Sequence, residues 1–395
     1  MLLPLLTHYL SPKDYGTLAI FQVFLALTIP LVGMSMQNNI LRNFAKMSKG
    51  EMAKLIGSLI SILCITTGIL TVATLVWSAS QGIIFGIPVW LFAILPLIAA
   101  SSVLLAFLQT VLRNQDRLLL YGCFLVSNSL FNLVLSIIFV VVMGFGWLGR
   151  ASGIAGSLIC FGIVGLIALR RQRLLDFKFN RQIIKDVLEI SLPLIPHAIG
   201  GIILTSSDRF FLDKMVNREV VGLYAVGYCF GMIVNIFVDS FSQAWSPWFF
   251  RQMACSTKQI QQKIVGYTYL SFGVFILIAF SVTGVSYVFL PYILSEKYQG
   301  ASQFIFWIAG GYAFRGMYIM VSPYLFYAGK TNFLGVGTIS IAMVNLILNY
   351  FLIRINGAIG AAQSTLISWM LLFLCTWANS ARICRMPWLS YRKGT

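Results

Sequence analysis

The chain has 395 residues, of which 59% are hydrophobic and only 10% are charged, and its formal net charge is +17. Soluble domains carry about 25% charged residues, so this composition excludes a protein that is mainly water-facing. In a membrane protein, excess Lys and Arg set the topology and contact anionic lipid. We favour that interpretation over nucleic-acid binding, because the sequence shows no wettable basic face.

Apolar stretches long enough to cross a bilayer recur along the whole chain. A hydrocarbon core of about 30 Å needs about 20 residues of helix. The chain opens on a shorter apolar stub, Met1–Leu10, which we interpret as the second half of an incomplete first helix. The spans that follow are predicted at Tyr15–Met36, Leu55–Trp77, Val89–Leu112, Leu118–Met143, Ala151–Leu169, Leu188–Ser207, Val220–Ser246, Ile264–Leu290, Ala301–Tyr327, Asn332–Ile353 and Ala358–Ser380. The sequence therefore predicts an all-α, polytopic membrane helix bundle.

Basic residues gather in alternate loops, which indicates the orientation of the chain. Of the 28 Lys and Arg residues, 20 lie in one set of loops. These loops are 42–54, 113–117, 170–185, 251–263, Lys330 and the segment from Arg382 onward. Because cytoplasmic loops carry the excess of positive charge, this set and the C-terminus are predicted to be cytoplasmic.

Matching motifs in the same order indicate two related halves. Gly16 opens a span in the first half and Gly222 does so in the second, and Asn132-Leu-Val-Leu matches Asn345-Leu-Ile-Leu. We therefore expect two six-helix lobes related by a parallel pseudo-two-fold axis, with a substrate site between the lobes near the midplane. The predicted divisions are an N-terminal lobe at 1–169, a basic cytoplasmic linker at 170–187, a C-terminal lobe at 188–380 and a basic cytoplasmic tail at 381–395.

Polar side chains recur at helical spacing inside three spans. The three sets are Asn235, Asp239 and Gln243; Asn128 and Asn132; and Asn345 and Asn349. Such residues are costly in lipid and usually face the bundle interior or a wet cavity. They either bond neighbouring helices or line a path for sugars, and the sequence leaves both interpretations open. For Asp239 we favour function, because an ionised carboxylate needs a cation or water.

Arg315 is the strongest single candidate for a binding residue. It lies in the middle of a span with no carboxylate near it in sequence. An Arg fork binds phosphate oxygens through two hydrogen bonds, although a static pair with Asp239 or Asp208 is the alternative. Arg42 and Arg251, at matching cytoplasmic ends of two spans, are candidates for admitting an anionic substrate, or they anchor helices.

Three further residues are candidates for a gate or for ion coupling. Asp208 and Arg209 follow a span at its outside end, where they form either a local helix-end pair or part of a gate. His197 follows Pro196 in a kinked helix. A lone histidine in this setting is more often a packed residue than a proton relay.

The sequence gives no support for dinucleotide binding, metal binding or catalysis. Gly144-Phe-Gly-Trp-Leu-Gly149 matches the dinucleotide-binding pattern but joins two membrane spans, so we interpret it as a chance match. With two histidines and no Cys-x-x-Cys, the chain is not expected to hold a metal site, and we expect no cofactor. Without a large loop or a soluble scaffold for catalytic residues, we expect a transporter and not an enzyme.

Short motifs in a fairly specific order resemble a known family. They are Leu10-Ser-Pro-Lys-Asp-Tyr-Gly16, Ser191-Leu-Pro-Leu-Ile-Pro196, Ser207-Asp-Arg-Phe-Phe-Leu212, Val221-Gly-Leu-Tyr224 and Ala244-Trp-Ser-Pro247. Together they look like the polysaccharide biosynthesis oligosaccharide flippases. These belong to the multidrug/oligosaccharidyl-lipid/polysaccharide superfamily, which also contains MATE transporters.

The resemblance implies a function as well as a fold. It implies a flippase that uses alternating access to move undecaprenyl-pyrophosphate-linked repeat units to the periplasmic leaflet of a bacterial inner membrane. The product would be O-antigen, capsule or exopolysaccharide. The implied partners are the lipid-linked glycan, membrane lipid, a polysaccharide polymerase, a chain-length regulator and a Na⁺ or H⁺ counter-ion. The alternatives are a multidrug or cation extruder of the same superfamily and, from a different class, a membrane glycan polymerase or acyltransferase.

Overall fold

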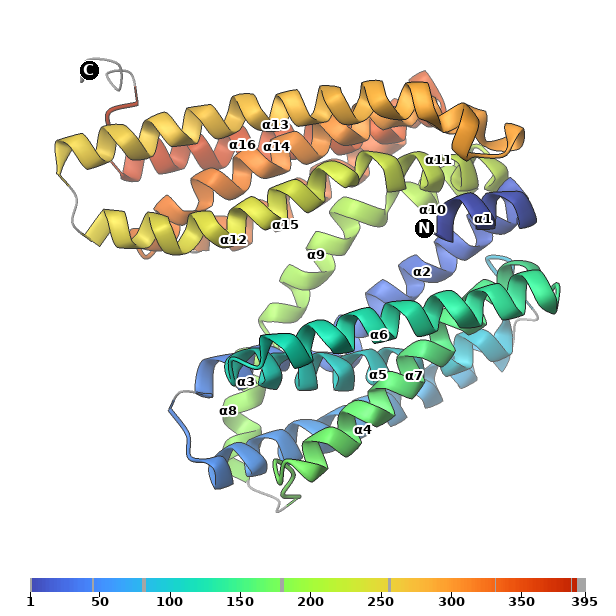
Figure 1. Cartoon of the computed structure of the whole chain (residues 1–395), viewed down its shortest axis with the longest axis horizontal. Coiled ribbons are helices and arrows are strands. Elements are labelled where there is room, and N and C mark those ends of the chain that lie inside the picture. The colour runs from blue at the N-terminus through green and yellow to red at the C-terminus, as the bar shows by residue number, and fades with distance from the viewer. Residues whose placement is uncertain are drawn as a thin grey trace. The chain divides into compact units, whose positions relative to one another are not determined.

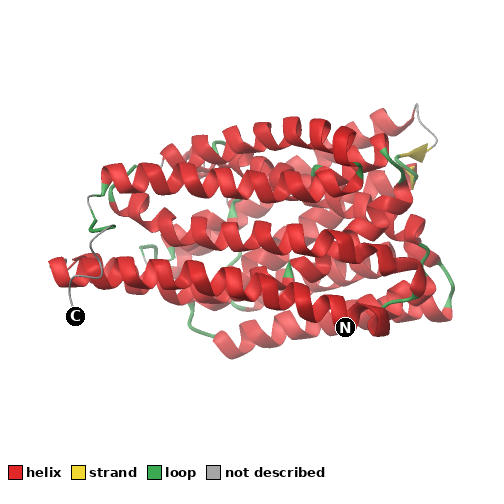
Figure 2. Ribbon diagram, turned by 90° about the horizontal axis from the view of Figure 1, so that it is seen from above, coloured by secondary structure: helices red, strands yellow, loops and turns green. Residues whose placement is uncertain are grey.

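The computed structural model describes residues 2–44, 46–79, 83–177, 181–254, 257–330, 332–384 and 386–388. Figure 2 shows that helices make up nearly all of this described chain. The strands form one short antiparallel hairpin, β1 (Ile83–Ile84) with β2 (Ile87–Pro88). Parts of the predicted linker and tail, residues 178–180, 385 and 389–395, lie outside the described residues.

The helices follow the predicted spans closely (Figure 1). In the first part of the chain they are α1 (Leu2–Tyr9), α2 (Pro12–Gly33), α3 (Gln37–Asn43), α4 (Lys49–Ala79), α5 (Val89–Asn114), α6 (Leu118–Ile137), the π-helix η1 (Ile138–Val142), α7 (Gly146–Arg171), α8 (Arg181–Ser191) and α9 (Leu194–Ser206). The remainder are α10 (Asp208–Met215), α11 (Arg218–Gly231), α12 (Ile233–Ala254), α13 (Lys258–Ile293), the 3₁₀-helix η2 (Glu296–Ala301), α14 (Ser302–Tyr327), α15 (Asn332–Asn356) and α16 (Ala358–Ile383).

Within the described residues, 11 helical segments are long and apolar enough to cross a membrane. Each predicted span overlaps one of them, which confirms the all-α, multi-pass class. Helices satisfy their own backbone hydrogen bonds, which is the condition for spanning lipid. One segment, Arg181–Ser206, is interrupted after Ser191 where Pro193 removes a donor from the helical ladder.

The chain divides into two compact units. One, the C-terminal unit, holds Leu3–Gly16 and the chain from Ile203 onward, and the N-terminal unit holds Thr17–Ile202. Both divisions fall inside helices, in α2 and α9, and not in the basic segment at 170–187. The predicted lobe boundaries in that segment stay a prediction.

The C-terminal unit is built around α14, which packs against α11, α12, α13 and α16, while α15 packs on α16. The short α1 belongs to this unit. The hydroxyl of Tyr298 donates to the Leu10 carbonyl at 3.1 Å, and Lys297 Nζ donates to the His8 carbonyl at 3.2 Å. Tyr298 itself is buried in a cluster with Val226. The start of the chain is therefore held by residues near the start of α14.

The N-terminal unit packs α5 between α4 and α7, and α7 also contacts α6. The short α3 and α8 are joined by a buried hydrogen bond from Asn39 Nδ2 to Ser191 Oγ of 2.9 Å. Between α2 and α3 the backbone turns at Met34 and Ser35, which have φ of 47° and 54°. That turn separates α3 from the long helix before it.

Two glycines let α2 and α11 cross at backbone distance inside the C-terminal unit. A Cβ added to Gly16 would collide with the carbonyl oxygen of Arg218, and one added to Gly222 would collide with that of Pro12. Each glycine thus faces the residue four positions before the other glycine. These two glycines are the ones that the sequence analysis matched between the two halves, and the repeat itself stays a prediction.

Candidate functional site

The polar stripe of α12 meets the central arginine of α14. Asn235 and Asp239 lie one turn apart on α12, and Asn235 Nδ2 donates to Asp239 Oδ2 at 2.8 Å. Arg315 Nη1 donates to Asp239 Oδ1 at 2.9 Å and also donates to Asn235 Oδ1. Of the partners that the sequence left open for Arg315, the structure therefore selects Asp239. The spacing of Asn235 and Asp239 correctly predicts that both lie on one face.

This cluster stays accessible on one side. The Arg315 side chain is 25% exposed and that of Asp239 46%. The guanidinium carbon lies 5.8 Å from the ring centroid of Trp369 in α16, which supports it by a cation–π contact. Among the described residues, only Nη1 of Arg315 carries a hydrogen bond. Because guanidinium has five donors, the Nε and Nη2 edge, which can bind an oxyanion through two bonds, has no protein acceptor.

Four of the predicted site residues are exposed. Gln243 is exposed one turn beyond Asp239. Arg251 is exposed in the last turn of α12, and Arg42 is exposed in the last turn of α3. His197 is exposed on α9. Among the described contacts, none brings Gln243 or Arg251, which belong to the same unit as Arg315, into the Arg315 cluster.

The asparagines of α15 form a buried amide cluster. Asn345 Nδ2 donates to Ser364 Oγ at 3.1 Å and to Ser368 Oγ at 3.0 Å, both on α16. Its Oδ1 accepts from Ser207 Oγ and from Asn349 Nδ2, each at 3.0 Å. Such contacts are those that the interhelical interpretation requires, since they tie α15 to α16 and to the residue before α10. A role of Asn345 and Asn349 on a glycan path stays a prediction.

We expect Asn345→Ala to destabilise the protein by about 1–2 kcal/mol, because it removes the acceptor of the Ser207 hydroxyl and the donor to Ser364 and Ser368. Asn38→Ala, at an exposed position of α3, is the matched control. Thermal unfolding of the detergent-purified variants measures the effect. Equal midpoints for Asn345→Ala and Asn38→Ala would show that the cluster contributes nothing to helix association.

The asparagines of α6 have a similar arrangement in the N-terminal unit. Asn132 Nδ2 donates to Ser157 Oγ of α7 at 2.9 Å. Arg150 Nη1 donates to Asn132 Oδ1 and, at 2.6 Å, to Ser136 Oγ. The Oδ1 of Asn128 is buried and has no hydrogen-bond partner among the described residues. Sequence reasoning missed Arg150 because the predicted span began at Ala151, whereas α7 begins at Gly146.

Asp208 and Arg209 form a buried pair at the start of α10. Arg209 Nη1 lies 3.2 Å from Asp208 Oδ1, and Asp208 is 2% exposed. The second carboxylate oxygen accepts from the hydroxyl of Tyr224, and the Arg209 guanidinium lies 4.5 Å from the ring centroid of Tyr228. This geometry has the form of the local pair that the sequence analysis considered. The two tyrosines lie one turn apart on α11, and that spacing is the signal that could have identified them.

The remaining motif assignments concern cofactors and metals. Of the three glycines at 144–149, Gly144 (φ 68°) lies in the turn between η1 and α7, Gly146 (φ 55°) begins α7 and Gly149 lies within it. The π-helix η1 precedes this turn, where a dinucleotide site would have a strand. Among the described residues, no group of three or more His, Cys, Asp or Glu side chains could hold a metal ion.

Comparison with known proteins places this geometry in context. A family model described as polysaccharide biosynthesis protein matches residues 1–253. The Lsg locus protein 1 of Haemophilus influenzae is 22% identical over 339 residues, which cover 84% of this chain and 81% of that protein.

Solved structures share the fold. An inward-facing MATE-family multidrug transporter of the MOP superfamily has a TM-score of 0.61 and 17% identity, covering 100% of this chain and 94% of that one. The lipid II flippase MurJ in an inward closed conformation has a TM-score of 0.61 and 15% identity, covering 94% and 82%. At these identities the likeness shows the fold alone.

Proposed function

The chain belongs to the polysaccharide biosynthesis protein family, and from that premise we propose that it is a flippase for undecaprenyl-pyrophosphate-linked oligosaccharide repeat units. The direction would be from the cytoplasmic to the periplasmic leaflet of a bacterial inner membrane, by alternating access, for O-antigen, capsule or exopolysaccharide. The fold supports a transporter of this kind, because it is shared with proteins described as a lipid II flippase and as multidrug transporters.

One observation carries the proposal most directly. Arg315 lies within a helix of the bundle, one of its guanidinium nitrogens is held by Asp239 and Asn235, and its bidentate edge has no acceptor among the described residues. A pyrophosphate presents oxygen pairs spaced for that edge. A purely structural arginine in lipid would be expected to use more of its donors, since each unpaired polar group in the bilayer is costly.

In this proposal, the Asp239 carboxylate occupies Arg315 until the pyrophosphate of the substrate binds. In the free protein, Asp239 balances the charge of Arg315. When a pyrophosphate binds the open edge, it adds negative charge beside that carboxylate, and repulsion favours release of Asp239. The freed carboxylate would accept hydrogen bonds from the hydroxyls of the glycan, and the amides of Asn235 and Gln243 would donate to them and accept from them. The amides Asn128, Asn132, Asn345 and Asn349 are the further positions proposed for the glycan path.

Two other parts of the mechanism are substrate entry and ion coupling. Arg42 and Arg251 are exposed at helix ends, where a cation would attract the pyrophosphate before it reaches Arg315. Coupling to Na⁺ or H⁺ would use a carboxylate whose partner can be exchanged. The candidates for this coupling are Asp239, which is partly exposed beside Arg315, the buried Asp208–Arg209 pair and exposed His197. A polymerase and a chain-length regulator would act on the delivered units.

A multidrug or cation extruder is the second candidate. The 46% exposed carboxylate of Asp239 favours it, because a cationic drug could replace Arg315 as its partner. The central arginine argues against it, since its charge repels a cationic cargo. Drug sensitivity of a strain that lacks the protein separates the two candidates.

The proposed function is tested by deleting the protein from its host. We expect lipid-linked repeat units to accumulate on the cytoplasmic side of the inner membrane and surface polysaccharide to disappear. Extracted lipid-linked glycan is measured by mass spectrometry, and plasmid-borne wild-type protein is the control. Unchanged surface polysaccharide together with heightened drug sensitivity would replace the flippase proposal with the extruder.

A further inference from the structure

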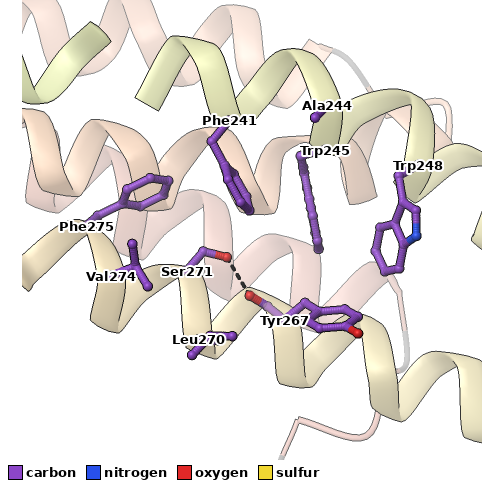
Figure 3. Close-up of a pocket in the computed structure, with 9 residues that line it drawn as sticks. All are labelled: Phe241, Ala244, Trp245, Trp248, Tyr267, Leu270, Ser271, Val274 and Phe275. Atoms are coloured by element: carbon purple, nitrogen blue, oxygen red, sulfur yellow. Dashed lines mark hydrogen bonds between the residues drawn. The ribbon is translucent and has the colours of Figure 1, made fainter. Parts of the chain in front are cut away.

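A groove lined by aromatic rings lies between α12 and α13 in the C-terminal unit (Figure 3). Its volume is about 350 Å³. The lining residues are Phe241, Ala244, Trp245 and Trp248 on α12 and Tyr267, Leu270, Ser271, Val274 and Phe275 on α13. Figure 3 shows the rings of Phe241, Trp245 and Trp248 projecting from α12 toward α13. The groove is separate from the residues that hold Arg315.

The aromatic walls are held in place by one another. Phe241 and Trp245 stack at 6.3 Å between ring centroids, and Phe241 meets Phe275 edge to face at 5.9 Å. Trp248 meets Tyr267 edge to face at 5.4 Å, which links the two helices at one end of the groove. Because the walls are rigid side chains already in contact, an apolar chain can occupy the groove at a low cost in side-chain ordering.

Positive charge lies directly beyond one end of the groove. Arg251 follows Trp248 by three residues on α12, and Lys263 precedes Tyr267 by four residues on α13. These spacings put each cation on the same helix face as the ring, one turn away. Both side chains are exposed. The end marked by the Trp248–Tyr267 contact is thus flanked by cations from both helices, as an anionic head attached to an apolar chain would require.

From these observations we infer that the groove binds the polyprenyl chain of the substrate's carrier lipid, with its phosphate groups between Arg251 and Lys263 before they pass to Arg315. The inference rests on the proposed function, and it gives Arg251 a definite partner. Two cations on opposing helices match a diphosphate, which carries more charge than the single phosphate of most phospholipids. A polyprenyl chain bound in the groove would keep the phosphate groups of the lipid aligned with the protein while the glycan moves.

Photo-crosslinking in living cells tests the groove directly. The photoreactive residue p-benzoylphenylalanine is placed at Leu270, which lines the groove and is 62% exposed, or at Leu277, two turns further along α13 and 66% exposed. After irradiation, mass spectrometry of the purified protein identifies the lipid bound at each position. We expect undecaprenyl adducts at 270 to exceed those at 277 by about tenfold, with phospholipid adducts similar at both. Phospholipid adducts alone at 270, or equal undecaprenyl labelling at both positions, would overturn the inference.

A substitution of one aromatic residue that lines the groove tests whether the aromatic rings bind the polyprenyl chain. Trp248→Ala is introduced into the protein that carries p-benzoylphenylalanine at position 270. This change should reduce the undecaprenyl adduct about fivefold or more and leave the amount of phospholipid adduct unchanged. The phospholipid adduct thus serves as the internal standard for folding. Trp90→Ala is the control, since Trp90 is a 54% exposed tryptophan of α5 in the other unit. An undecaprenyl adduct that is insensitive to Trp248→Ala contradicts a site made by the aromatic walls.

The two proposals fail in different ways. If deletion of the protein blocks export but position 270 captures only phospholipid, the flippase proposal stands and the groove proposal falls. If deletion leaves surface polysaccharide unchanged, the function proposal falls whatever lipid is captured.

Discussion

Replacing Arg315 with alanine is expected to abolish surface polysaccharide while leaving the amount of protein in the membrane unchanged. The variant loses the open guanidinium edge that is proposed to hold the pyrophosphate. Hydrogen bonds to charged groups contribute about 1.5–3 kcal/mol each, so losing two of them should lower export by a factor of about 100 or more. Surface glycan is quantified by gel or by antibody, and membrane abundance by immunoblot.

Two companion variants distinguish substrate binding from a structural ion pair. Arg315→Lys keeps the charge but not the fork, so we expect partial export. Asp239→Asn removes the internal counter-charge but leaves the arginine and its bond to Asn235, so export should fall much less than in Arg315→Ala. If Arg315→Ala and Asp239→Asn are equally defective, and both lower protein abundance, the pair is structural and the pyrophosphate assignment is wrong. Arg354→Ala, at an exposed residue of α15, is the control for loss of a basic side chain.

Gly222→Ala is expected to be among the most destabilising single-methyl changes in the chain. The added carbon would meet the Pro12 carbonyl, which is backbone and cannot rotate away as a side chain can. Overpacking a tight contact costs about 1–3 kcal/mol, and separating two helices at their crossing adds lost contacts along both. We expect reduced membrane abundance and a lower thermal midpoint in detergent. Gly16→Ala, its reciprocal partner, should behave alike.

A glycine in open space provides the matched control for this prediction. Gly284 lies inside α13, and a Cβ added there would meet nothing within 4 Å. Gly284→Ala should be neutral or slightly stabilising, because alanine favours helix over glycine by about 1 kcal/mol. If Gly222→Ala and Gly284→Ala leave the thermal midpoint equally unchanged, then α2 and α11 do not need backbone contact.

The membrane spans could be predicted because lipid imposes length and hydropathy on each helix separately. The predicted span Val89–Leu112 became α5 at Val89–Asn114, and the predicted start at Ala358 is the start of α16. Interruptions inside spans were harder to predict. The span Val220–Ser246 holds a break at Met232, between α11 and α12, where Gly231 packs closely against Ile308. That contact is non-local and leaves no periodic signal.

The site was predictable only as far as single helices determine it. The spacing of Asn235 and Asp239 placed both on one face, and the isolation of Arg315 marked it as unusual. The choice of Asp239 over Asp208 as its partner depends on how α12 packs on α14, 76 residues away in sequence. Asp208 is instead occupied by Arg209 and Tyr224. The role of the Tyr224 hydroxyl was not predicted, and the only sign of it in the sequence is the one-turn spacing of Tyr224 and Tyr228.

The hydrogen bond between Tyr298 and the Leu10 carbonyl has a consequence for how the chain is made. Its two residues are 288 positions apart. At about 5–20 residues per second, the ribosome needs roughly 15 to 60 s to supply the second after the first. During that interval α1 lacks the residues that hold it in the finished fold, so the C-terminal unit closes only after the start of α14 has been made. Insertion of the early helices and final assembly are thus separate events in the biogenesis of this protein.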